Sequence, residues 1–180
     1  MNLPTLTKFF TTATHDRWSQ GLIHPGWNKL HQDLEYANKP FNDDVTVAEW
    51  RGYGLDFNKY TGDIIDYPDL PEWVLPIAEQ TGLDNIGASL YRMNPGCILP
   101  NHSDTYQLYK KFHNITHNRI FRVIVFLEEW ASGHYFEVDG TPITGWQAGY
   151  WVGWHYDTPH LASNLGITNR YTMQITGTYN

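Results

Sequence analysis

The sequence contains few of the residues that several common kinds of protein site require. Cys97 is its one cysteine, which excludes an internal disulfide and a zinc or iron–sulfur site built from several thiolates. Basic residues gather nowhere beyond Lys110-Lys111, and the formal net charge is −7, so nonspecific nucleic-acid binding is disfavoured. The sequence also lacks an apolar run of about 18 residues and an apolar amino-terminal segment, so we expect a cytoplasmic protein without membrane contact. Any metal site here has to use histidine and carboxylate ligands.

Aromatic residues are abundant and charged residues are scarce. They make up 16% and 17% of the chain, and tryptophan, tyrosine and glycine are spread along it. This composition is typical of a β-rich globular domain rather than a helical bundle or a disordered chain. A chain of 180 residues fits one domain with a substantial core. The composition does not determine the oligomeric state.

The second half of the chain has the pattern of an antiparallel β structure. Short apolar, aromatic or β-branched runs alternate with turn signals such as Asn-Pro-Gly, Ser-Gly and Asp-Gly. The expected strands are Ala88 to Met93, Ile120 to Leu127, Tyr135 to Val138, Tyr150 to Trp154, His160 to Ser163 and Tyr171 to Thr178. The pattern predicts a mainly β sandwich or barrel.

The first 86 residues predict elements that pack on the outside of this core. We expect a short helix over Lys29 to Ala37, a strand over Trp50 to Leu55 and a polar loop over Asn58 to Pro71. A second helix, Pro71 to Gly82, begins near a proline and ends at a glycine.

Three residues have the order and types of a metal-binding facial triad. His102 and Asp104 form a His-x-Asp motif, and on a strand both would point to one face and could bind one cation. His160 would complete the set from a distant strand. Two imidazoles and one carboxylate suit non-haem Fe(II) and leave positions open for a co-substrate and dioxygen. A zinc site with the same ligands, or a turn that these residues only cap, are the alternatives.

Arg170 follows His160 by ten residues and is a candidate for binding a carboxylate. A guanidinium binds a carboxylate at two points, and Thr172 on the same strand face can add a hydroxyl hydrogen bond. A 2-oxo acid that chelates iron needs its distant carboxylate held in this way. The alternative is an ordinary surface pair on a terminal strand.

The polar and aromatic segment Thr105 to Asn118 follows Asp104 directly. A segment in this place would overhang the metal and is a candidate substrate lid, with a surface loop free of substrate contact as the alternative. Its candidate lid residues are Tyr106, Tyr109, Phe112, His113 and His117.

With these motifs in place, the sequence resembles the 2-oxoglutarate- and Fe(II)-dependent oxygenases, and among them the aspartyl/asparaginyl β-hydroxylase-like branch. The features that match, over about residues 88 to 178, are Gly96, Leu99 to Asp104, Arg119 or Arg122 before Val123 to Leu127, Trp146 to Gly149, Asp157, His160, Asn164 and Arg170. Several members of that branch lack the carboxylate ligand that Asp104 supplies here, so the resemblance does not transfer a substrate. The chain is also similar to small oxygenases encoded by phages of marine cyanobacteria.

The resemblance implies a double-stranded β-helix, or jelly roll, with flanking N-terminal helices. It implies one oxygenase domain over 1–180, in which 1–86 flank a metal-binding β core at 87–180. The implied cofactors are Fe(II), 2-oxoglutarate as co-substrate and O2.

The resemblance also assigns residues around the co-substrate. It implies that Arg170 binds the 5-carboxylate of 2-oxoglutarate, and it places Tyr91 beside the co-substrate. Arg122 is the candidate for the other carboxylate, with Arg119 or a plain structural role as the alternatives. Separately, Asp157 and His155 lie near the distal histidine in sequence and are candidates for orienting an imidazole ligand, with a plain flanking strand residue as the alternative for His155. The metal triad and the co-substrate residues together give the predicted site: His102, Asp104, His160, Arg170, Thr172, Tyr91 and Arg122.

The expected reaction is hydroxylation of a C–H bond, coupled to oxidative decarboxylation of 2-oxoglutarate to succinate and CO2. A peptidyl residue of a protein or peptide and a small amino-acid-like metabolite both fit as substrate. A non-catalytic metal-binding jelly-roll module is one alternative, although such a module has no use for Arg170. A cupin-like hydrolase or isomerase that uses zinc or manganese is another, and it would not depend on 2-oxoglutarate.

Overall fold

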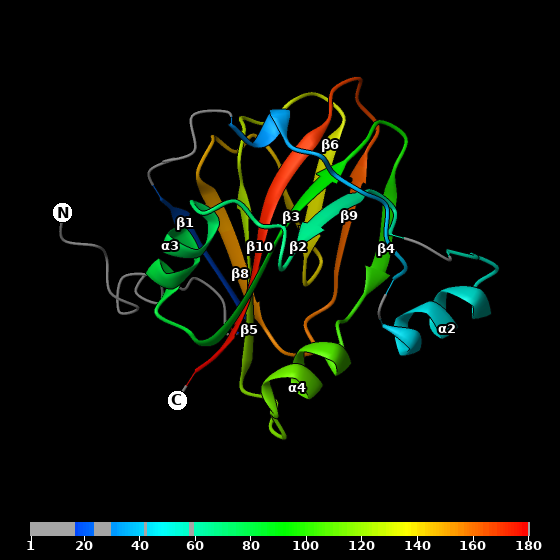
Figure 1. Ribbon diagram of the computed structural model, residues 1–180. Coiled ribbons are helices and arrows are strands. Elements are labelled where there is room, and N and C mark those ends of the chain that lie inside the picture. The colour runs from blue at the N-terminus through cyan, green and yellow to red at the C-terminus, as the bar shows by residue number, and fades with distance from the viewer. Residues whose placement is uncertain (1–16, 24–29, 42, 58–59, 180) are drawn as a thin grey trace.

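The protein consists of two antiparallel β-sheets packed face to face, with short helices around them (Figure 1). The computed structural model describes residues 17–23, 30–41, 43–57 and 60–179. In these residues the large sheet has, in spatial order, β1 (Trp18–Leu22), β8 (Tyr150–His155), β5 (Ile120–Phe126), β10 (Arg170–Thr178), β3 (Asp84–Met93) and β2 (Asp63–Asp66). The small sheet has β4 (Ile98–His102), β9 (His160–Asn164), β6 (His134–Val138) and β7 (Thr141–Ile143).

The helical elements lie outside the sheets. They are η1 (Leu30–Asp33), α2 (Asp44–Gly52), α3 (Val74–Ala78), η2 (Glu79–Thr81) and α4 (Gln107–His113). Among the described residues, no helix is long and apolar enough to cross a membrane.

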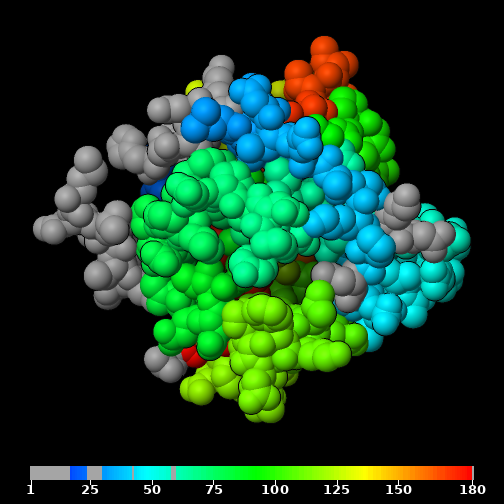
Figure 2. Space-filling model, viewed as in Figure 1, coloured from blue at the N-terminus to red at the C-terminus, as the bar shows by residue number. Residues whose placement is uncertain are grey.

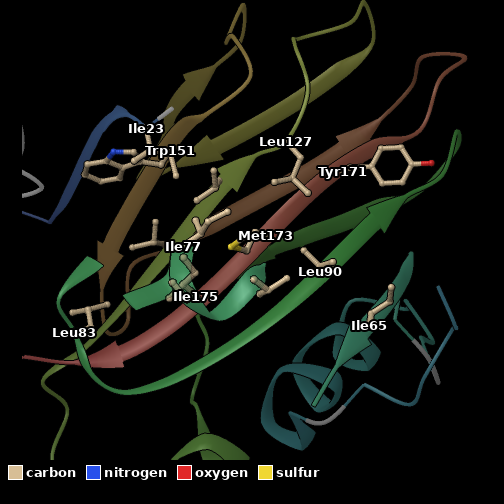
Figure 3. Close-up of a cluster of buried hydrophobic side chains, with 14 of the residues drawn as sticks. Ile23, Ile65, Ile77, Leu83, Leu90, Leu127, Trp151, Tyr171, Met173 and Ile175 are labelled. Carbon is tan, nitrogen blue, oxygen red and sulfur yellow. The ribbon is translucent and has the colours of Figure 1, made fainter. Parts of the chain in front are cut away.

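The large sheet is covered on both faces because its strands alternate between two cores. On β10, Met173 and Ile175 face outward and pack against α3, where Figure 3 shows them near Ile77. Arg170 and Thr172 have the opposite orientation and face the space between the sheets. One strand therefore supplies both the outer core and the polar wall of the interior.

Apolar side chains from both sheets fill one end of the space between them. Phe126 of β5 packs on Phe136 of β6, and its ring stacks on Trp146 at a centroid distance of 3.9 Å. This closed end forces any ligand-binding space toward the other end of the sandwich.

The predicted mainly β jelly roll is confirmed. All six expected strands are present, with ends within a few residues of the predicted ones. The helix expected over Pro71 to Gly82 exists as α3 and η2, and Gly82 ends it with φ +65°. The helix expected over Lys29 to Ala37 shortens to η1, and Lys29 lies outside the described residues.

Two expectations for the first half of the chain are wrong. The strand expected over Trp50 to Leu55 is instead the end of α2, which buries Val47 and Trp50 on one face, three residues apart. The loop expected over Asn58 to Pro71 contains β2, because Ile64 and Ile65 are buried as this strand pairs with β3.

Asp43 connects α2 to the loop that follows β4. Its Oδ1 accepts a hydrogen bond from the backbone N–H of Thr46 at 3.1 Å, which caps the helix. Its Oδ2 accepts from the backbone N–H of Thr105 at 2.9 Å and from the Thr105 hydroxyl at 2.6 Å. The first half of the chain is thereby attached next to Asp104.

We expect Asp43→Ala to lower the free energy of unfolding by about 1–3 kcal/mol, because a helix cap and two further hydrogen bonds are lost. Urea unfolding monitored by tryptophan fluorescence measures the change. Asp44→Ala is the matched control, because the neighbouring exposed carboxylate contributes only about 0.3–1 kcal/mol through the helix dipole. Equal effects of the two substitutions would contradict this role of Asp43.

Candidate metal centre and its cavity

Two histidines from neighbouring strands form the base of the candidate metal centre. His102 is the last residue of β4 and His160 is the first of β9, and the register of this antiparallel pair places them opposite each other. Their ring centroids are 4.3 Å apart. Both residues are buried, with exposed fractions of 4% and 5%.

Asp104 completes a group of three possible metal ligands. Its Oδ1 is 3.6 Å from Nε2 of His102, and its Oδ2 is 3.8 Å from Nε2 of His160. One ligand atom from each residue lies within 4.8 Å of the others. The expectation that His102 and Asp104 share a strand face is wrong, because β4 ends at His102 and Asp104 lies in the following loop.

Backbone carbonyls orient both imidazoles. Nδ1 of His102 lies 2.8 Å from the carbonyl oxygen of Pro100, and Nδ1 of His160 lies 3.0 Å from that of Thr158. Since a carbonyl oxygen only accepts, each Nδ1 donates its proton, and the lone pair of Nε2 faces Asp104. Burial, followed by the charge of His102, lowers the pKa of His160 to about 3. Its imidazole is therefore neutral and able to bind a metal at neutral pH.

Asp157 and His155 do not orient these imidazoles, so that prediction is wrong. Asp157 is exposed and accepts a hydrogen bond from Arg17 at 3.1 Å. Nδ1 of His155 lies 3.1 Å from the hydroxyl of Tyr179. His155 ends β8 and faces the opposite side of the sheet from Trp154, which lines the cavity, while Asp157 lies in the turn that follows.

Arg122 pairs with the carboxylate of the triad. It lies on β5, and its Nη2 donates to Oδ2 of Asp104 at 3.1 Å. Burial alone would raise the pKa of Asp104, but the charge of Arg122 holds this pKa well below its usual range. Arg119, the alternative to Arg122, is exposed and does not line the site.

A cavity of about 610 Å³ extends from the triad to the surface. Figure 2 shows the molecular face hollowed between the segment that follows β2 and the α4 region. Residues of both sheets and of these two segments line it, among them His102, Asp104, His160, Arg170, Thr172, Tyr91 and Arg122. All seven residues expected at the site therefore share one cavity.

Arg170 has a buried guanidinium that is not paired with a carboxylate in the described part of the chain. Its exposed fraction is 4%, its Nη1 donates to the carbonyl of Tyr135 at 2.8 Å, and its Nε has no partner there. Burial lowers the pKa of Arg170 to about 10, so it remains charged at neutral pH. Thr172 follows on the same face, and Tyr91 lies opposite Thr172 on β3.

The predicted lid segment contains α4 and borders the cavity. Tyr106, Tyr109, Phe112 and His113 line it, whereas His117 does not. Their position at the cavity agrees with a lid, and contact with a substrate stays a prediction.

Sequence reasoning missed Gln174 and Thr176. Both continue the row of Arg170 and Thr172 along β10 and face the cavity. The period of two along a strand would have identified them, had it been continued past Thr172.

We expect the depressed pKa of His160 to make the metal-free protein less stable in acid. Between pH 6.5 and pH 4 the unfolded chain takes up a proton at this position that the folded chain does not. The free energy of unfolding then falls by up to about 1.4 kcal/mol per pH unit. In His160→Gln this contribution is absent, so urea unfolding across this range should show a shallower decline. Both proteins are treated with a chelator to remove metal. Equal pH slopes of the unfolding free energy for the wild type and His160→Gln would contradict the lowered pKa of His160.

Comparison with known proteins supports the fold rather than a particular activity. No family model and no curated protein matches the sequence. A prolyl-4-hydroxylase from Pseudomonas putida superposes with a TM-score of 0.56 and 16% identity, over 98% of this chain and 100% of that one. The cupin domain of Cnp3 from Schizosaccharomyces pombe matches with a TM-score of 0.43 and 9% identity, over 66% of each chain. The likeness to the prolyl-4-hydroxylase and the two antiparallel sheets together show a double-stranded β-helix fold.

Proposed function

We propose that the protein is an Fe(II)- and 2-oxoglutarate-dependent dioxygenase that hydroxylates a C–H bond and releases succinate and CO2. The observation that carries this proposal is the presence, in one cavity, of a two-histidine, one-carboxylate centre and a buried guanidinium without a counter-charge. The aspartyl/asparaginyl branch and a phage origin remain expectations from the resemblance.

The triad fits a divalent transition metal. His102 and His160 would each provide a neutral Nε2, and Asp104 would provide one carboxylate oxygen. This donor set suits Fe(II), and three ligands on one side leave the cavity side free. When bound, Fe(II) supplies the oxygen activation and oxidative chemistry, while the protein supplies binding and orientation.

Arg170 provides the best support for 2-oxoglutarate as co-substrate. A buried charge without a partner is costly, and a ligand carboxylate would remove that cost through a two-point hydrogen bond. Thr172 and Tyr91, opposite each other on β10 and β3, would flank the same carboxylate. A 2-oxo acid with a second carboxylate can occupy this position while its other end reaches the metal.

Arg122 is proposed as a second contact of the co-substrate. Its guanidinium already binds Asp104 and Gln174, but its buried Nε has no partner among the described residues. This nitrogen could donate to the other carboxylate without releasing Asp104. The substrate itself we propose to be a peptidyl residue or an amino-acid-like molecule.

The test is succinate release from 2-oxoglutarate by the aerobic protein supplied with Fe(II) and ascorbate. We expect release above background, and none from Asp104→Ala, because the metal loses its carboxylate ligand. Arg170→Ala should raise the 2-oxoglutarate concentration needed for half-maximal rate about ten- to a hundredfold, the value of one charged hydrogen bond of about 1.5–3 kcal/mol.

Arg92→Ala is the control for this measurement, because Arg92 pairs with Asp63 outside the cavity. An unchanged 2-oxoglutarate requirement in Arg170→Ala would refute the role of Arg170. Metal binding without any consumption of 2-oxoglutarate would favour the cupin-like hydrolase or isomerase instead.

A further inference from the structure

Tyr106 brings a hydroxyl group close to the metal centre. The residue lies two positions after Asp104, its exposed fraction is 6%, and it lines the cavity. Its hydroxyl is buried next to Arg122 and Asp104 and makes no hydrogen bond of regular geometry to a described residue. Buried polar atoms are nearly always satisfied, so a ligand that gives this hydroxyl a well-aligned partner would be favoured.

Gln174 presents an oriented amide to the same cavity. Nη1 of Arg122 donates to Oε1 of Gln174 at 3.1 Å. Because a guanidinium has no acceptor, the amide oxygen has to face Arg122, and the NH2 group is directed away from it. No hydrogen bond of this NH2 group to another described residue is found, and Gln174 lines the cavity. Its two N–H donors are therefore available to a ligand.

Arg122 fixes both donors relative to the metal centre. The guanidinium carbon lies 5.2 Å from the centre of the Tyr106 ring, while its nitrogens bind Gln174 and Asp104. Tyr106 also contacts Tyr156, at a centroid distance of 5.9 Å. Tyr106 itself has φ +56°, a conformation that costs an aromatic residue energy and is often found at functional sites.

The cavity wall leaves no ionic group free for a charged substrate. Arg122 is neutralised by Asp104, and Arg170 is the cation proposed for the co-substrate. Of the other described carboxylates on the wall, Asp43 is hydrogen-bonded to the loop after β4 and Asp66 is paired with a lysine. A free amino acid would have to leave both of its charged ends without partners, which is costly in a buried site.

Several exposed apolar side chains line the cavity. Tyr67 and Phe112 are 78% and 76% exposed, and Leu75 is half exposed. Exposed apolar groups around a cavity mark a site for an apolar ligand. An uncharged ligand with an apolar body suits these side chains.

We propose that Tyr106 and Gln174 form a subsite for a neutral carbonyl oxygen, so that the substrate is an amide-bearing, peptide-like molecule rather than a free amino acid. The inference rests on the proposed function in one respect, namely that the co-substrate occupies Arg170. The donor roles of Tyr106 and Gln174 rest on the geometry alone. The O–H of Tyr106 and the NH2 group of Gln174, on two residues that both contact Arg122, match an acceptor oxygen, and the paired charges nearby favour an uncharged one.

The test uses protein loaded with Zn(II), which permits ligand-observed NMR without turnover, with and without 2-oxoglutarate. The probes are a pool of N-acetyl amino-acid amides and a pool of the same amino acids in free form. We expect saturation transfer to the amide pool only. Tyr106→Phe should weaken the best-binding amide about three- to tenfold, the value of one neutral hydrogen bond. Gln174→Glu keeps an acceptor for Arg122 but replaces the NH2 donor, and should weaken binding at least as much.

Tyr53→Phe is the control, because that hydroxyl is exposed at the end of α2. Equal binding of both pools, no amide binding, or wild-type amide affinity in Tyr106→Phe would overturn the subsite. Failure of 2-oxoglutarate to bind would count against the proposed function. Amide binding that still depends on Tyr106 in that case would leave the subsite standing.

Discussion

The pairing of β4 with β9 is the constraint on which the candidate site depends. It places the last residue of one strand, His102, opposite the first residue of the other, His160. A slip of one residue would turn one imidazole to the other face of the sheet and destroy the centre. The backbone carbonyls of the same two segments then set each ring by accepting from Nδ1. The centre is therefore prepared by the backbone before any metal binds.

The polar side chains of the cavity form three regions: a neutralised ion pair, an unpaired cation and a neutral amide. Asp104 and Arg122 neutralise each other beside the histidines, which keeps the carboxylate ionised despite its burial. Arg170 lies farther along the cavity on β10, on the strand face that also carries Gln174, and has no counter-charge among the described residues. Between these two arginines Gln174 offers only neutral donors. A dianionic co-substrate and an uncharged substrate could share such a cavity without competing for the same groups.

Much of this arrangement could be predicted from the sequence. Strands rich in apolar, aromatic or β-branched residues were predicted, because strands that bury side chains on both faces, as β5 and β10 do, need such residues at most positions. β1 and β2 were missed, because short edge strands depend on their pairing with β8 and β3 rather than on their own pattern. The triad and Arg170 were identified by residue type and spacing.

Residue spacing did not predict contacts that depend on turns. Asp157 and His155 are close to His160 in sequence but point elsewhere, and the ligand imidazoles are held by backbone carbonyls. The pairing of Arg122 with Asp104 joins β5 to a loop beyond β4, and no local pattern encodes such a contact. Strand periodicity gave Arg170 and Thr172 and would have given Gln174 if continued along β10, but the orientation of the Gln174 amide follows only from its bond to Arg122.

The most direct measurement is an anaerobic titration of the Fe(II)-loaded protein with 2-oxoglutarate, followed by visible absorption. The account predicts a weak, saturable metal-to-ligand charge-transfer band, because the triad leaves room for a chelating 2-oxo acid whose far carboxylate meets Arg170. Fe(II) binding without any such band, and without binding of 2-oxoglutarate by calorimetry, would contradict the account.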